Sequence, residues 1–176
     1  MRPMLTVVEN RHPDFGSTSI ADEYMFPVSC DTSDWDVILR ERLYELTHLK
    51  PGWDGYGSPP VQMDVATIAN AVLSNLALAI KSSFTINIDL PTAPYLCAVS
   101  GGGLQAEWHF DDQYFLELYF DTGCEELAAN FYSEGLAEEI DESTFLDISS
   151  SQFDAGPVVS WFLKVQELID AHREAA

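Results

Sequence analysis

Three polar side chains that could do chemistry alternate along one short stretch of the chain, at Gln105, Glu107 and His109. In a β-strand, side chains two residues apart point to the same face, so these three would lie side by side. A carboxylate next to an imidazole can move protons or share a metal ion. The other histidines occur in unrelated segments, at His12, His48 and His172. Acid–base or metal chemistry therefore competes here with a simpler interpretation, a polar and solvated sheet face.

Other patterns typical of catalysis or cofactor binding are weak. Cys124 is surrounded by Asp121, Glu125 and Glu126, and negative charges raise a thiol pKa and make a poor nucleophile. The acidic residues lack the spacing and the central glycine of a calcium-binding loop. The three cysteines are widely separated and form no metal-binding pair, at Cys30, Cys97 and Cys124. We expect no cofactor and no metal, reduced thiols and a cytoplasmic location.

The distribution of charge is the strongest signal in this sequence. The chain has 29 acidic and 8 basic residues, a net charge of −21, and the whole stretch from Ser82 to Leu163 contains no lysine and no arginine. A soluble surface does not require such an imbalance, since mixed charges give solubility with less self-repulsion. The acidity disfavours direct binding to nucleic acid or to anionic membranes. It favours a basic protein as the partner, or cations.

The composition predicts a folded domain. The chain has 176 residues, of which 47% are hydrophobic and 12% aromatic, enough for a core despite the charge. We expect an N-terminal arm over residues 1–30 and a single α+β domain over 31–176. The apolar runs are shorter than the roughly 20 residues of a membrane span. The N-terminus becomes polar at Glu9, too early for the core of a signal peptide.

Hydrophobic periodicity predicts the elements that would position these side chains. Apolar residues recur at helical spacing from about residue 31 to 50, from 62 to 81 and from 156 to 172, with Asp154 as a cap for the last helix. Between the second and third helices the period becomes two, which predicts four antiparallel strands joined by tight turns. A further edge strand is expected around Leu136 to Ile140. This order predicts an α+β fold with the helices packed on one face of a meander.

The segment from Pro51 to Pro60 combines three glycines, three prolines and two aromatic residues. Its glycines permit positive φ, its prolines fix the chain, and Asp54 can accept backbone hydrogen bonds. One interpretation is a rigid connector with Trp53 and Tyr56 packed onto the core. The alternative is a loop that presents Trp53 and Tyr56 to a partner.

This loop also carries a resemblance. The pattern Trp-Asp-Gly-Tyr-Gly-x-Pro-Pro from Trp53, then an alanine-rich helix, then Ser-Gly-Gly-Gly-Leu-Gln-Ala-Glu-Trp ending at Trp108, resembles a group of small bacterial and phage-borne proteins. The resemblance covers roughly residues 45–120. It implies a helix, loop, helix and hairpin in that order, and it supplies no catalytic residue.

These observations favour a non-enzymatic inhibitor that offers an acidic sheet to the nucleic-acid-binding surface of a basic partner. Carboxylates spaced about 6–7 Å apart along a strand can imitate phosphate spacing. Aromatic residues among the acids would add contact energy, namely Trp108, Phe110, Tyr114, Tyr119, Phe131 and Tyr132. The predicted binding residues are Glu107, Asp111, Asp112, Glu117, Asp121, Glu125, Glu126, Glu134, Glu138, Glu139, Asp141, Glu142, Trp53 and Tyr56.

Such an inhibitor could be a phage anti-CRISPR or other anti-defence protein, or an antitoxin or immunity protein that neutralises a nuclease. Both need the same acidic surface, and either could act as a homodimer. A second hypothesis is a small hydrolase or transferase that uses Glu107, His109 and Asp54. A third is a structural subunit of a larger assembly.

Overall fold

The structure is a computed structural model that describes residues 33–83, 93–111, 113–123, 125–135, 139–148 and 153–175. The expected N-terminal arm lies outside the described residues. The fold is α+β, as predicted. The elements in order are α1 (Ser33–Thr47), α2 (Met63–Ser83), β1 (Tyr95–Val99), β2 (Gly103–Phe110), β3 (Tyr114–Phe120), β4 (Glu126–Ser133), β5 (Asp141–Asp147) and α3 (Gly156–Ala175).

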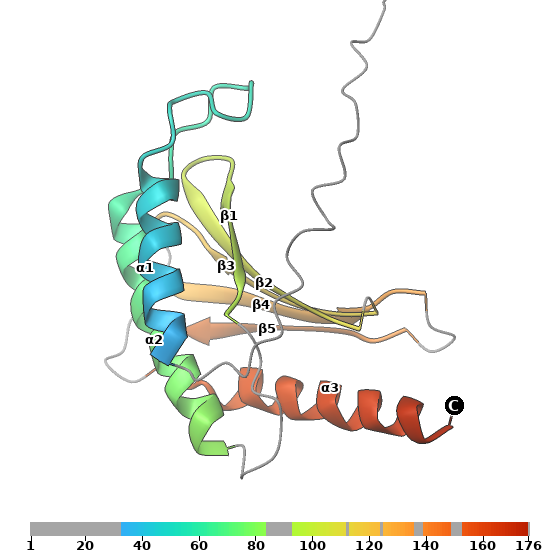
Figure 1. The fold of residues 1–176 in the computed structure, drawn as a ribbon. Coiled ribbons are helices and arrows are strands. Elements are labelled where there is room, and N and C mark those ends of the chain that lie inside the picture. Colours follow the sequence, from blue (N-terminus) through green and yellow to red (C-terminus); the bar gives the residue numbers. More distant parts are fainter. Residues whose placement is uncertain are drawn as a thin grey trace, which may run out of the picture.

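The described strands form one antiparallel meander in the order β1-β2-β3-β4-β5. The strands turn progressively from β1 to β5, so the sheet is strongly twisted (Figure 1). The Ser100–Gly102 turn joins β1 to β2, as the glycine-rich segment predicts. The turns after β2 and β4 lie together at the opposite end of the sheet, where Glu134 N donates to Gln113 O at 2.9 Å.

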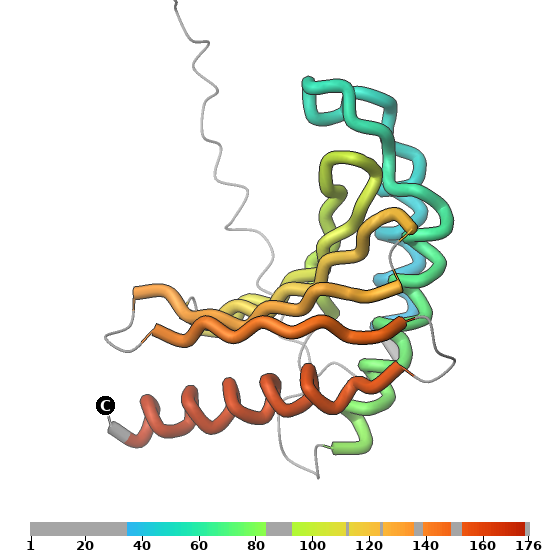
Figure 2. The backbone as a smooth tube through the Cα atoms, turned by 180° about the vertical axis from the view of Figure 1, so that it is seen from behind, coloured from blue at the N-terminus to red at the C-terminus, as the bar shows by residue number. Residues whose placement is uncertain are grey.

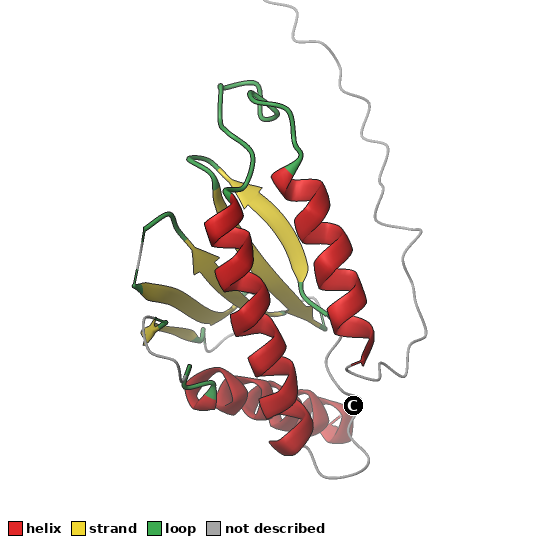
Figure 3. Ribbon diagram, turned by 90° about the vertical axis from the view of Figure 1, so that its left-hand side faces the viewer, coloured by secondary structure: helices red, strands yellow, loops and turns green. Residues whose placement is uncertain are grey.

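All three helices pack on one face of this sheet, which therefore holds the core (Figure 3). Trp35 of α1 lies 6.0 Å from Trp108 of β2, and Trp161 of α3 lies 6.0 Å from Phe131 of β4, between ring centroids. Figure 2 shows α3 running alongside β5, below the strands. Within the part of the chain that the structure describes, no helix covers the other face of the sheet.

Helix α2 combines core packing with high apolar content. Its apolar stripe is fully buried, at Val65, Ala69, Leu73, Leu76 and Ile80. Among the described helices, α2 alone is long and apolar enough to cross a membrane by length and composition. Its alanines allow the close approach to α1 that the sequence predicts.

Three predicted boundaries change in the structure. The edge strand is Asp141–Asp147, whereas Ile140 precedes it and residues 136–138 lie outside the described chain. The expected edge strand is thus present, but it begins after the segment assigned to it; β5 buries only Leu146, so its sequence lacks the apolar alternation that would have located it. Helix α1 ends at Thr47, before Pro51, and α3 extends to Ala175. Asp154 caps α3 as predicted, because its Oδ1 accepts Gly156 N at 2.9 Å.

Candidate functional site: the open face of the sheet

The uncovered face, here called the open face, is formed by alternate residues of all five described strands. In β2 and β3 every second residue is buried under the helices, and the residues between them point to the open face. The strand register aligns these residues in rows across the sheet. The open face comprises Tyr95, Cys97, Val99, Gln105, Glu107, His109, Phe115, Glu117, Tyr119, Glu126, Ala128, Asn130, Tyr132, Asp141, Ser143, Phe145 and Asp147.

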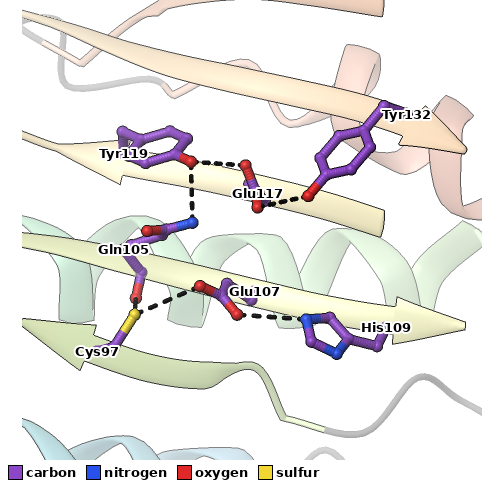
Figure 4. A network of polar contacts seen from close by, with 7 residues as sticks. All are labelled: Cys97, Gln105, Glu107, His109, Glu117, Tyr119 and Tyr132. Carbon is purple, nitrogen blue, oxygen red and sulfur yellow. Dashed lines mark hydrogen bonds and ion pairs between the residues drawn. The ribbon is translucent and has the colours of Figure 1, made fainter. Parts of the chain in front are cut away.

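Two carboxylates meet at the centre of this face. Glu107 of β2 is paired directly with Glu117 of β3 in the antiparallel register. Like charges opposite one another destabilise a sheet unless their lone pairs are occupied. Figure 4 shows that both carboxylates accept hydrogen bonds from uncharged or weakly basic neighbours on the same face. None of these four contacts comes from a lysine or an arginine.

Glu107 is held by Cys97 and His109. The Cys97 thiol donates to Glu107 Oε1 at 3.4 Å, and His109 Nε2 lies 3.2 Å from Glu107 Oε2. Burial, and then the adjacent Glu107 carboxylate, raise the pKa of the Cys97 thiol to about 12. Cys97 is therefore a poor nucleophile at neutral pH. The other two cysteines lie outside the described residues.

Glu117 is held by two tyrosines. Tyr119 Oη donates to Glu117 Oε2 at 2.6 Å, and Tyr132 Oη donates to Glu117 Oε1 at 2.9 Å. Gln105 Nε2 in turn donates to Tyr119 Oη at 2.9 Å. Burial and the hydrogen bond to Glu117 raise the pKa of Tyr132 to about 12 and raise that of Tyr119 as well. Both hydroxyls thus stay protonated and keep the carboxylate solvated by protein donors.

Aromatic rings flank the central carboxylates. Phe115 and Tyr132 stack with ring centroids 5.1 Å apart, and the His109 ring meets the edge of Phe115 at 5.0 Å. Tyr95 and Phe145 lie toward opposite sides of the sheet and are 62% and 72% exposed. The open face therefore combines negative charge with accessible apolar area, which is typical of protein-binding surfaces.

An acidic hollow lies at the end of the open face near the β3–β4 turn. Its volume is about 640 Å³, and its apolar side is formed by Tyr119, Ala128 and Phe145. Its acidic rim consists of Asp121, Glu125 and Glu126, three of the predicted binding residues. Phe145 is absent from the residues predicted from sequence, because a single aromatic residue in a polar strand gives no periodic signal.

A smaller hollow of about 360 Å³ lies near the β4–β5 turn, at the other end of the sheet. Glu134, Glu139 and Asp141 line it together with Tyr132. Asp111 is exposed in the neighbouring β2–β3 turn. Its φ of 53° is the left-handed conformation that aspartate tolerates in tight turns. Asp112 and Glu138 lie outside the described residues.

One predicted binding acid lies on the opposite, helix-covered side. Glu142 pairs with Phe131 across β4 and β5, where it accepts Trp161 Nε1 at 2.8 Å and contacts Lys164 Nζ. The hydrogen bond to Lys164 is the main cause of a lowered Glu142 pKa. Glu142 therefore joins α3 to the sheet and is not part of the open face.

Most of the aromatic residues expected among the acids are also on the covered side. Trp108, Tyr114 and Phe131 are at most 3% exposed, and Phe110 packs against Phe162 with centroids 5.6 Å apart. That part of the sequence prediction was wrong. These rings occupy the same alternate positions of their strands as the buried leucines, so they point to the covered face. Only Tyr119 and Tyr132 of the predicted set are on the open face, and the structure adds Tyr95, Phe115 and Phe145.

The loop after α1 is a self-bonded connector that still exposes its tyrosine. Asp54 accepts hydrogen bonds from Tyr56 N at 2.9 Å and from Ser58 Oγ at 2.5 Å, and these bonds lower its pKa. Trp53 Nε1 donates to Pro59 O at 3.0 Å. Tyr56 is 95% exposed, so the expectation that it packs onto the core was wrong. The loop adjoins the β1–β2 turn, because Gln62 N donates to Gly102 O at 3.0 Å.

The residues of the enzyme hypothesis do not converge. Glu107 and His109 are in contact, but His109 is 56% exposed on the sheet surface, and neither residue lines the two acidic hollows. Asp54 lies near the opposite end of β2 and is occupied by its own loop. Within the described ranges, no group of three or more histidine, cysteine, aspartate or glutamate side chains could hold a metal ion. Comparisons of this chain with protein-family models, with curated proteins and with solved structures found no match.

Proposed function

We propose that this protein is a non-enzymatic inhibitor whose open face binds the basic, nucleic-acid-binding surface of a partner protein. The observation that carries the proposal is the pair of facing carboxylates, Glu107 and Glu117, at the centre of an uncovered sheet. A structural role alone would not require two negative charges there, since like charges opposed across strands cost stability. Two basic side chains from a partner would neutralise both carboxylates, and a single lysine or arginine placed between them would relieve their repulsion.

Accessory acids extend this charge to both ends of the sheet. The rim of the larger hollow contributes Asp121, Glu125 and Glu126, and the other end contributes Asp111, Glu134, Glu139 and Asp141. Two described cations near the sheet are already paired: Lys164 contacts Glu142 on the covered side, and Arg42 at the β1 edge pairs with Glu45 of its own helix at 2.8 Å. The field of the open face therefore stays negative. Such a field accelerates association with a basic surface.

The exposed aromatic residues supply binding energy that charge alone does not. Charged rims set association rates, whereas buried aromatic anchors supply most of the binding energy at interfaces. Phe145 and Tyr95 offer such anchors on the open face, and Tyr56 offers one beyond the β1–β2 turn. An anti-defence protein and an antitoxin for a nuclease both fit this surface, and the class of partner is a basic protein that binds nucleic acid.

The test begins with affinity capture from a bacterial lysate at low salt, followed by elution in a salt gradient and mass spectrometry. The captured protein is then purified, and its binding to labelled DNA and RNA is measured with increasing amounts of the acidic protein. We expect competition that weakens as salt rises, because screening reduces the charge attraction.

Two matched variants sharpen this test. The double substitution Glu107→Gln and Glu117→Gln removes the central charges from the open face, whereas Glu142→Gln removes one charge from the covered side. We expect the double variant to bind the captured protein at least about tenfold more weakly, and Glu142→Gln to bind normally. Capture of a ribosomal mixture that elutes at low salt, or equal binding by all variants, would contradict the proposal.

A further inference from the structure

The two edge strands of the sheet, β1 and β5, differ in what contacts their outer sides. At the β1 edge, α1 packs against the strand, and Arg42 Nε donates to the carbonyl oxygen of Leu96 at 3.1 Å. The Arg42 guanidinium also lies 5.8 Å from the centre of the Tyr95 ring. A strand could join this edge only by displacing these contacts. An occupied edge is a common protection against unwanted strand pairing.

The β5 edge lies at the other side of the sheet, and no strand among the described residues pairs with its outer side. The β4–β5 ladder ends in hydrogen bonds from Ser133 N to Ile140 O and from Ile148 N to Glu125 O, both 2.9 Å. Hydrogen-bonded pairs alternate in an antiparallel ladder, so the even-numbered residues of β5 bond to β4. The backbone groups of Ser143 and Phe145 therefore point away from β4, toward the free edge.

The same outward residues carry their side chains on the open face. Asp141 and Ser143 are exposed, and Phe145 is 72% exposed and forms the apolar side of the larger hollow. A strand added here would place its own alternate side chains beside this acidic and aromatic surface. A lysine or arginine opposite Phe145 would lie across its ring and point toward Glu126.

From this arrangement we infer that the free edge of β5 binds an extended lysine- or arginine-bearing segment of the partner as a sixth strand. The inference rests on the proposed function and specifies how the partner is held. Backbone hydrogen bonds would supply affinity, and the acids of the open face would select basic side chains. Charge also disfavours a second copy, because fully overlapped antiparallel β5 strands would place Asp141 opposite Asp147.

The test uses a short synthetic peptide that alternates lysine with threonine. When the peptide pairs antiparallel to β5 with its lysines on the open face, its lysine amides face β5 and its threonine amides face solvent. One control peptide is methylated on the backbone nitrogen of every lysine, and another on the backbone nitrogen of every threonine. Both keep the charge of the parent peptide. We expect the lysine-methylated peptide to bind more than about tenfold more weakly than the parent, and the threonine-methylated peptide to bind like the parent. The parent should also slow hydrogen exchange at the amides of Ser143 and Phe145.

Protein variants provide an independent readout. Ser143→Pro removes an outward N–H without removing a hydrogen bond to β4, whereas Ser143→Val loses the same hydroxyl and keeps the N–H. With both variants checked for folding by urea denaturation, only the proline variant should lose peptide binding.

The ways in which this inference can fail are distinguishable. Equal binding of both methylated peptides would overturn strand addition and leave the proposed function standing. Absence of parent-peptide binding at low salt would overturn the inference, whereas the proposed function would fail only on the capture and variant results given above. Protection of the same amides in a dimer formed without peptide would show that a second copy occupies this edge and would overturn the inference.

Discussion

Alkaline pH should destabilise this protein through the tyrosines that hold Glu117. Tyr132 has an ordinary pKa of 10.0, and burial, the hydrogen bond to Glu117 and the Glu117 charge raise its pKa to about 12 in the folded state. A group whose pKa is higher in the folded state contributes stability that is complete below the unfolded pKa. That stability is lost as pH rises toward the folded pKa, because only the unfolded chain releases the proton.

The size of this effect follows from the difference in pKa. Each pKa unit corresponds to about 1.4 kcal/mol, so between about pH 8 and about pH 11 Tyr132 alone should lower the free energy of unfolding by about 1.4 kcal/mol. Cys97 and Tyr119 act in the same direction, because burial and neighbouring carboxylates raise their pKa values as well. The wild-type protein should therefore lose more stability over this range than Tyr132 accounts for.

The assay is urea denaturation at both pH values, for the wild-type protein and for Tyr132→Phe. The variant should lose about 1.4 kcal/mol less between the two pH values than the wild type does. Tyrosinate absorbance, followed through the same titration, should show Tyr132 ionising at lower pH in Glu117→Gln, since the neighbouring charge is gone. Equal losses in wild type and Tyr132→Phe would contradict this explanation and with it the arrangement of donors around Glu117.

Three further predictions concern the covered face and the turns. Glu142→Gln should lower the free energy of unfolding by less than about 1 kcal/mol in urea at neutral pH, because its pair with Lys164 is partly exposed. The lowered Glu142 pKa means that this contribution is present above its unfolded pKa and fades as pH falls. Gly102→Ala should destabilise more than Gly101→Ala in thermal melts: both glycines have positive φ, near 90°, but an added Cβ at Gly102 would meet atoms 3.0 Å away. Tyr114→Phe should raise the free energy of unfolding by about 1 kcal/mol in urea, because its buried hydroxyl has no hydrogen-bond partner among the described residues.

The alternation along β2 and β3 is plain in the order of the residues. Leu104, Ala106 and Trp108 predicted one buried face, and Gln105 and Glu107 predicted the other, which the structure confirms. Hydrophobic burial gives a strong signal because one step along a strand moves a side chain to the opposite face. The same rule places Trp108 and Phe131 in the core, which contradicts the expectation that these two rings add contact energy among the acids.

The fifth strand shows where local pattern fails. Its residues from Asp141 to Asp147 include one buried leucine, so neither apolar alternation nor composition identifies it as a strand. It forms because β4 offers a complete ladder of partners, and its inner residue Glu142 finds Trp161 and Lys164 on α3. Those partners are distant in sequence, and no local rule could assign them.

The order of the three helices and the first four strands, the buried stripe of each helix and the concentration of negative charge could therefore be predicted from the amino-acid sequence. Periodicity and composition are local properties, and they act through burial and through the sum of charges. Three features could be identified only in the folded chain. Glu107 faces Glu117, two tyrosines donate hydrogen bonds to Glu117, and Glu142 lies on the covered side of the sheet. These features depend on strand register and on where α3 packs, which are set by contacts among residues far apart in the chain.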